Sequence, residues 1–196
     1  MNTAAEQYGA TARRGAFFER RVGQAVQDWL QSLPGVYHLF HDLVHLDRLT
    51  GAGLPPLSLG STNIDHLVLT GAGWLLIDAK GCGAGVLGTD DEGRGQLIAP
   101  NGERVAQPWM DTSRSYSQAG AAYRLTDGRK GQLVWVVPAE TVIDETSAAR
   151  ARIFEKSGTL CDLGEVVSGA LTTMLPEPAP VDPQVLERLN GHLAVS

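Results

Sequence analysis

The sequence contains little cysteine and no long hydrophobic run. Only Cys82 and Cys161 are cysteines among its 196 residues, so at most one disulfide bond is available and a reducing compartment is predicted. No stretch approaches the ~20 consecutive apolar residues that a membrane-spanning helix needs. The N-terminal region lacks the apolar run of ~7–15 residues that is typical of a secretory signal. We therefore expect a cytoplasmic protein that contacts no membrane.

Basic residues are also scarce. The chain has 16 Lys and Arg against 22 Asp and Glu, which gives a formal net charge of −6. Proteins that hold DNA through a long, non-specific contact are usually basic overall. A function in nucleic-acid binding would therefore depend on a local basic patch, or on metal ions that offset acidic side chains.

The length and the order of elements predict one layered domain. Domains average ~150 residues, so residues 1–196 are expected to form a single domain. We expect its core over about 12–175, with a C-terminal helix over 182–193 appended to it. The order of helix, several strands, helix, strand and helix is typical of an α/β fold.

Hydrophobic periodicity predicts the individual elements. An amphipathic helix is expected over about 14–33, with Glu19 at the edge of its apolar stripe, where an unpaired carboxylate is costly. Strands and a hairpin are predicted at 36–44, 63–69, 74–80, 86–98 and 132–137. Further helices are predicted from a cap at Asp111 or Thr112, around 163–174, and over 182–193 from a cap at Asp182.

Two of these strands, 63–69 and 74–80, are separated by the sequence TGAG, which predicts a hairpin. If the central Gly-Ala forms a two-residue turn, Asp65 lies directly opposite Asp78. Opposed side chains have Cβ atoms ~4.5–5.5 Å apart, so two carboxylates at these positions repel each other. A divalent cation between them removes the repulsion, and Mg²⁺ prefers such oxygen ligands.

Lys80 extends this pair of acids. It follows Asp78 by two residues, so strand alternation places both side chains on one face. Two carboxylates beside an ammonium group resemble a site of metal-assisted phosphodiester hydrolysis, in which a metal lowers the pKa of a bound water. Lys80 could orient or deprotonate that water, or hold a phosphate. The Asp-x-Lys pattern alone is a weak signal.

Three blocks of the sequence make the signal more specific. They are GAFFERRV at 15–22, NIDHLVL at 63–69 and GWLLIDAKG at 73–81. In order and spacing they resemble the nuclease-related domain family, NERD, a branch of the PD-(D/E)xK, restriction-endonuclease-like superfamily. The resemblance covers about residues 12–125 and is clearest at the N-terminal helix and the hairpin.

The resemblance implies a restriction-endonuclease-like fold, with a central mixed β-sheet flanked by helices, and Mg²⁺-dependent cleavage of DNA. Glu19 matches the helix carboxylate of the family, and Asp65 matches the first strand acid. Asp78 matches the second acid, where family members more often have Glu, and Lys80 matches the lysine. Mn²⁺ is expected to substitute for Mg²⁺.

Four groups are expected to bind metal: Asp65, Asp78, the backbone carbonyl of Ala79, and Glu19, the last through a second ion or a water. Three side chains are weaker candidates for contact with nucleic acid: Arg20, Arg114 and Gln118. Histidines are predicted to be structural. His38 and His41 point to opposite faces of a strand, so they cannot bind the same zinc ion. His66 faces away from Asp65.

A catalytically inactive module that keeps the nuclease fold is the alternative. Such a module would bind nucleic acid or a protein partner without Mg²⁺ and without Lys80, and the acidic composition favours it slightly. The intact set of two acids and a lysine argues against it. The sequence leaves open whether the substrate is DNA or RNA, whether one metal or two are bound, and whether the protein forms a homodimer.

Overall fold

The structure is a computed structural model that describes residues 4–60, 62–110, 113–144, 146 and 158–194. The helices are α1 (Ala4–Gln31), α2 (Ser113–Leu125), α4 (Leu163–Val167) and α5 (Pro183–Asn190), with 3₁₀ helices at Pro108–Met110 and Ala170–Met174. The strands are β1 (His38–Leu43), β2 (Leu49–Gly51), β3 (Leu54–Leu57), β4 (Ile64–Leu69), β5 (Trp74–Ala79), β6 (Gly85–Thr89), β7 (Gly95–Ile98), β8 (Arg104–Ala106), β9 (Gly131–Val137), β10 (Thr141–Ile143) and β11 (Gly158–Asp162).

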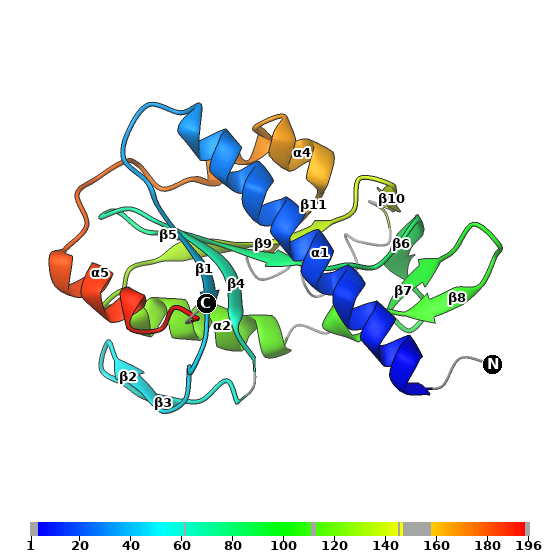
Figure 1. The fold of residues 1–196 in the computed structure, drawn as a ribbon, viewed down its shortest axis with the longest axis horizontal. Helices are drawn as coiled ribbons and strands as arrows, with labels where there is room; N and C mark the ends of the chain where they lie inside the picture. The colour runs from blue at the N-terminus through cyan, green and yellow to red at the C-terminus, as the bar shows by residue number, and fades with distance from the viewer. Residues whose placement is uncertain (1–3, 61, 111–112, 145, 147–157, 195–196) are drawn as a thin grey trace.

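Five strands form a mixed central sheet in the order β1-β4-β5-β9-β11. β4 runs antiparallel to β1 and β5, whereas β5, β9 and β11 run parallel to one another. Helices α1 and α4 cover one face of this sheet, and α2 and α5 cover the other (Figure 1). The predicted α/β fold, a mixed sheet flanked by helices, is confirmed.

Strand alternation divides the core into two layers. On β5, Leu75 and Ile77 pack among the apolar side chains of α1, whereas Trp74 and Leu76 pack on the side of α2 and α5. The same alternation continues to the end of the strand, so Asp78 follows Leu76 on the side of α2. The apolar run of β9 is buried from Leu133 to Val137 because both faces of this strand are covered.

The hairpin of β4 and β5 has the predicted register. His66 pairs with Ile77 and Leu69 pairs with Trp74, as a two-residue turn requires. The Thr70 N–H donates to the Gly73 carbonyl at 2.9 Å and closes the turn. One position beyond the last paired residues, this register brings Asp65 opposite Asp78.

Several elements differ from the prediction. α1 begins at Ala4, ten residues before the expected start near residue 14. The single helix expected over 163–174 is wrong: it is interrupted at Gly169, whose φ of 76° lies in the left-handed region and ends α4. β2 and β3, which form a two-stranded ribbon before β4, and the strands β8, β10 and β11 are absent from the prediction. The expected helix cap at 111 or 112 lies outside the described residues.

The C-terminal helix α5 belongs to the main core. Its N-terminus follows the prediction, because the Asp182 side chain accepts a hydrogen bond from the Gln184 N–H. Val185 and Leu189 are fully buried in the cluster beneath α2. The residues after α5 then cover the outer edge of β1, where the Val44 N–H donates to the His192 carbonyl at 2.7 Å. Within the described ranges, no helix has the length and apolarity to cross a bilayer.

Truncation of Leu189 tests whether α5 stabilises the domain. Leu189→Ala removes a side chain with 0% exposure and should lower the free energy of unfolding by ~2–5 kcal/mol, through lost burial and a cavity. Val167→Ala is the control, because that side chain is 69% exposed and its loss should change stability by less than about 0.5 kcal/mol. Urea denaturation followed by tryptophan fluorescence measures both. If both substitutions change the free energy of unfolding by equally small amounts, α5 does not stabilise the domain.

Candidate active site

Asp65 and Asp78 lie at the same end of the β4–β5 hairpin and are both buried. Asp65 is 9% exposed and Asp78 is 1% exposed. The Asp65 Oδ2 atom accepts a hydrogen bond of 2.9 Å from the Ala79 N–H, so this carboxylate reaches across to β5. The two acids that the sequence expected to face each other are thus brought together between neighbouring strands.

Lys80 completes this group from the residue after β5. Its Nζ atom lies 2.7 Å from Asp78 Oδ2, and its side chain keeps 20% of its surface exposed. The two atoms form an ion pair without hydrogen-bond geometry, so Asp78 Oδ2 is a buried oxygen that no donor among the described residues hydrogen-bonds. A buried acceptor in this state is costly, and a cation that binds it would lower the cost.

Glu19 reaches the same region from α1. Its half-buried carboxyl group forms a side-chain hydrogen bond with Asp42 of β1. Burial is the largest cause that raises the pKa of Glu19, and together with the hydrogen bond to Asp42 and the nearby carboxylates of Asp42 and Asp78 it brings this pKa from 4.5 to about 7. Glu19 therefore belongs to the acidic group although the sequence separates it widely from the hairpin.

Asp42 also belongs to this group, although no sequence motif indicates it. The β1–β4 register pairs His41 with His66 and Leu43 with Ile64, which brings Asp42 opposite Asp65. Its φ of 51° lies in the left-handed region, which is unusual for a residue other than glycine and concentrates at functional sites. Only the pairing of β1 with β4 reveals its position, and no local sequence signal indicated that pairing.

The charges in this group do not balance. Burial is the largest cause that raises the pKa of Asp65, and together with the carboxylates of Asp78 and Glu19 it brings this pKa from 3.8 to about 8. The Ala79 N–H and the Lys80 ammonium act in the opposite direction but do not cancel it. Because several acids face one lysine, the site is more stable when it takes up protons or a cation.

These residues fit Mg²⁺. The ion is usually held by one or two carboxylates and retains several waters, and Asp65 and Asp78 supply such a pair. The N–H and C=O groups of one strand residue point to the same side, so the Ala79 carbonyl faces the side on which its N–H meets Asp65. Among the described residues, no three His, Cys, Asp or Glu side chains converge to hold an ion.

The candidates for contact with nucleic acid differ in their accessibility. Arg20 is exposed on α1 beside Glu19. The side chain of Arg114 lies outside the described part of the structure. Gln118 is 4% exposed, and its amide donates to the Asn63 carbonyl at 2.9 Å. The Gln118 amide is therefore used within the protein, where it holds the segment that leads into β4.

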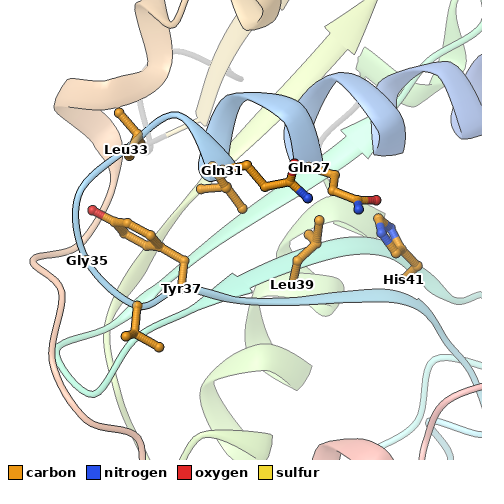
Figure 2. A pocket seen from close by; sticks show the side chains of 9 residues that line it. Gln27, Gln31, Leu33, Gly35, Tyr37, Leu39 and His41 are labelled. Atoms are coloured by element: carbon orange, nitrogen blue, oxygen red, sulfur yellow. The ribbon is translucent and has the colours of Figure 1, made fainter.

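Histidines occupy the opposite face of the hairpin. His66 faces α1, as its separation from Asp65 by one residue predicts, and burial lowers its pKa from 6.5 to about 4. His41 lies at one end of a cleft of ≈ 570 Å³ between the end of α1 and β1 (Figure 2). The lining of this cleft includes Gln27, Tyr37 and Leu39 and none of the acids described above.

The fold and the group of acids define a class of protein. The mixed sheet flanked by helices (Figure 1) is consistent with a nuclease-like α/β fold. The family model of the nuclease-related domain, NERD, matches residues 14–137, and the chain belongs to this family. The match includes α1 from residue 14 onwards, the β4–β5 hairpin and β9. Searches of curated proteins and of solved structures found no match.

The raised pKa of Asp65 predicts a pH-dependent stability without metal. The pKa of this carboxyl group is 3.8 in the unfolded chain and about 8 in the folded protein. The protonated group therefore contributes its full stabilisation at pH values below 3.8. That stabilisation is lost as the pH rises through the second value. Asp65→Asn cannot ionise but can still accept from Ala79. We therefore compare the free energies of unfolding of Asp65→Asn and the wild type in EDTA. As the pH rises from about 5 to about 8, their difference should shift in favour of the variant by at least about 1 kcal/mol.

Urea denaturation at these two pH values measures this difference. Asp91→Asn is the matched control, because Asp91 is exposed in the turn between β6 and β7. Parallel pH profiles for the wild type and Asp65→Asn would contradict the raised pKa.

Proposed function

We propose that this protein is a Mg²⁺-dependent nuclease that hydrolyses phosphodiester bonds, with DNA as its substrate. The observation that carries the proposal is the buried Oδ2 atom of Asp78, which no donor among the described residues hydrogen-bonds and which forms an ion pair with the amine of Lys80. The carboxylate of Asp65, on the neighbouring strand, is close enough to interact with that of Asp78. Membership of the nuclease-related family supports the same chemistry.

Asp65, Asp78 and the Ala79 carbonyl would hold the ion, and Glu19 would hold a second ion or a water. When bound, Mg²⁺ supplies a water of lowered pKa and stabilises the charge that develops on phosphate oxygens. Mn²⁺ would serve in its place, since it also prefers oxygen ligands. The departure from the common family pattern, Asp instead of Glu at position 78, shortens the reach of this ligand.

Lys80 is the group of this chain best placed to act on substrate. Its amine forms an ion pair with Asp78, and its partly exposed side chain leaves this amine accessible. As an ammonium group it can donate to a phosphate oxygen or orient the attacking water. Loss of the Lys80 amine would therefore remove a donor from the reacting phosphate and leave Asp78 without its ion pair.

Binding of nucleic acid would depend on the metal. The chain has a net charge of −6, and the acids of the site repel phosphate unless a cation is present. Arg20 and Arg114 are proposed to contribute contacts with phosphate. A homodimer, in which two sites would act on one duplex, is compatible with this proposal.

Plasmid nicking tests the proposed activity. With Mg²⁺, the wild type should relax supercoiled DNA, and EDTA should abolish the reaction. Asp78→Asn and Lys80→Ala should lower the rate by about 100-fold or more, since each removes a group that contacts metal or phosphate. Asp91→Asn, which changes an exposed acid far along the chain, should cleave like the wild type.

Equal cleavage by the wild type and both site variants would overturn the assignment of the site. The alternative hypothesis, a catalytically inactive module, predicts a different result. In that case the protein would not nick DNA under any metal, and a gel-shift assay in EDTA would show binding that survives both Asp78→Asn and Lys80→Ala.

Metal binding gives a test that does not depend on activity. Addition of Mg²⁺ or Mn²⁺ at about 100 times its Kd should stabilise the wild type by ~2.7 kcal/mol, measured as an increase in Tm. Asp78→Asn should lose most of this increase, because it removes one of the two principal carboxylates. Asp91→Asn should retain it. An equal increase for all three proteins would show that the ions bind elsewhere.

A further inference from the structure

Two histidines connect the acidic site to α1. His66 of β4 and His41 of β1 face each other across neighbouring strands, with their Nδ1 atoms 2.8 Å apart. Their rings meet edge to face, with centroids 4.9 Å apart and an interplanar angle of 85°. The other nitrogen of His66, Nε2, lies 3.2 Å from the backbone carbonyl oxygen of Glu19. Figure 2 shows His41 projecting from β1 towards α1, next to Gln27.

The contacts determine which nitrogens carry hydrogen. A carbonyl oxygen only accepts, so His66 must donate to Glu19 from Nε2. His66 is 3% exposed, and such burial disfavours the doubly protonated, charged ring, so its Nδ1 carries no hydrogen and accepts. His41 must then donate from Nδ1, which leaves its Nε2 as an acceptor. One tautomer for each ring follows from these three atoms.

Gly23 permits this approach to the helix. It lies four residues after Glu19, so its N–H is the helical partner of the Glu19 carbonyl. A Cβ atom at position 23 would lie 3.0 Å from His66 Cε1 and 3.2 Å from His41 Cε1. Glycine in a helix interior costs roughly 0.5–1 kcal/mol relative to alanine. At this position it leaves the space in which the ring of His66 reaches the helix backbone.

We propose that His66 is a positioning residue that fixes Glu19 relative to Asp65, with His41 holding the ring of His66 in the required tautomer. Asp65 and His66 are consecutive on β4, so one peptide unit and one hydrogen bond connect the strand acid to the backbone of the helix acid. This inference rests on the proposed function, because it assigns the positioning of Glu19 within that site.

α1 packs on the sheet through Phe18, Val22 and Val26, and the hydrophobic effect that drives this packing has no preferred direction. A hydrogen bond is directional, and this one ends on the backbone of Glu19 itself. Groups that orient metal ligands in this way typically contribute 10–100-fold in metal affinity or activity.

Nuclear magnetic resonance of protein labelled with ¹⁵N-histidine tests the hydrogen-bond chain directly. At neutral pH and without metal, long-range ¹H–¹⁵N spectra should identify the Nε2–H tautomer for His66 and the Nδ1–H tautomer for His41. An Nδ1–H tautomer for His66 would overturn the proposal, because that ring could not donate to the Glu19 carbonyl.

Two substitutions of His66 separate positioning from packing. His66→Gln places an amide N–H near the position of Nε2, whereas His66→Leu fills the space without a donor. In metal-free protein, the Gly23 amide should exchange with solvent about 5-fold faster in His66→Leu than in His66→Gln. Mn²⁺ affinity measured by calorimetry should fall about 10-fold or more in His66→Leu and stay within about 3-fold of the wild type in His66→Gln.

The control is His45→Leu, which changes an exposed histidine of the loop after β1 and should behave like the wild type. Equal effects of His66→Gln and His66→Leu, whether both neutral or both severe, would overturn the role of the N–H donor. If the wild type neither nicks DNA nor binds Mn²⁺, the proposed function fails. The tautomers and the Gly23 exchange rates would still decide whether His66 fixes the helix.

Discussion

Electrostatic repulsion among buried carboxylates is the constraint around which this structure is organised. Asp65 and Asp78 are almost fully removed from solvent at neighbouring positions of two strands, and Glu19 approaches from a helix. Carboxylates in a poorly solvated region cannot all remain charged without compensation. Lys80 compensates in part, and burial together with the neighbouring carboxylates raises the pKa values of Asp65 and Glu19.

The sheet holds these acids together against their repulsion. The β4–β5 hairpin fixes the register, and β9 secures the far side of β5, where the Lys80 N–H donates to the Val136 carbonyl at 2.8 Å. β5 and β9 are buried on both faces, so their position is determined by packing that extends well beyond the site. The rigid part of the fold thus supplies the free energy that keeps the acids close, as is common where binding sites are built on strands.

The strand β4 places functional side chains on both faces of the sheet. Alternation along β4 directs Asp65 and His66 to opposite sides, the first towards the acids and the second towards α1. The β1 edge contributes to both sides in the same way, through Asp42 and His41. The helix that carries Glu19 is therefore connected to the strand acids by a polar contact in addition to apolar packing. This gives the nuclease-like domain a physical means to keep a helix carboxylate in register with a strand.

The sequence alone determined the hairpin, the pairing of Asp65 with Asp78, the side of Lys80, and the family, because these depend on local alternation, a short turn and three contiguous blocks. It also placed the cap of α5 at Asp182, since capping is a local hydrogen bond. Only the tertiary structure decided that Asp42 joins the acids, that Gln118 is buried against Asn63, and that α5 lies in the core. Each of these depends on which distant strands pair and which faces meet, and such contacts leave no periodic signal in the chain.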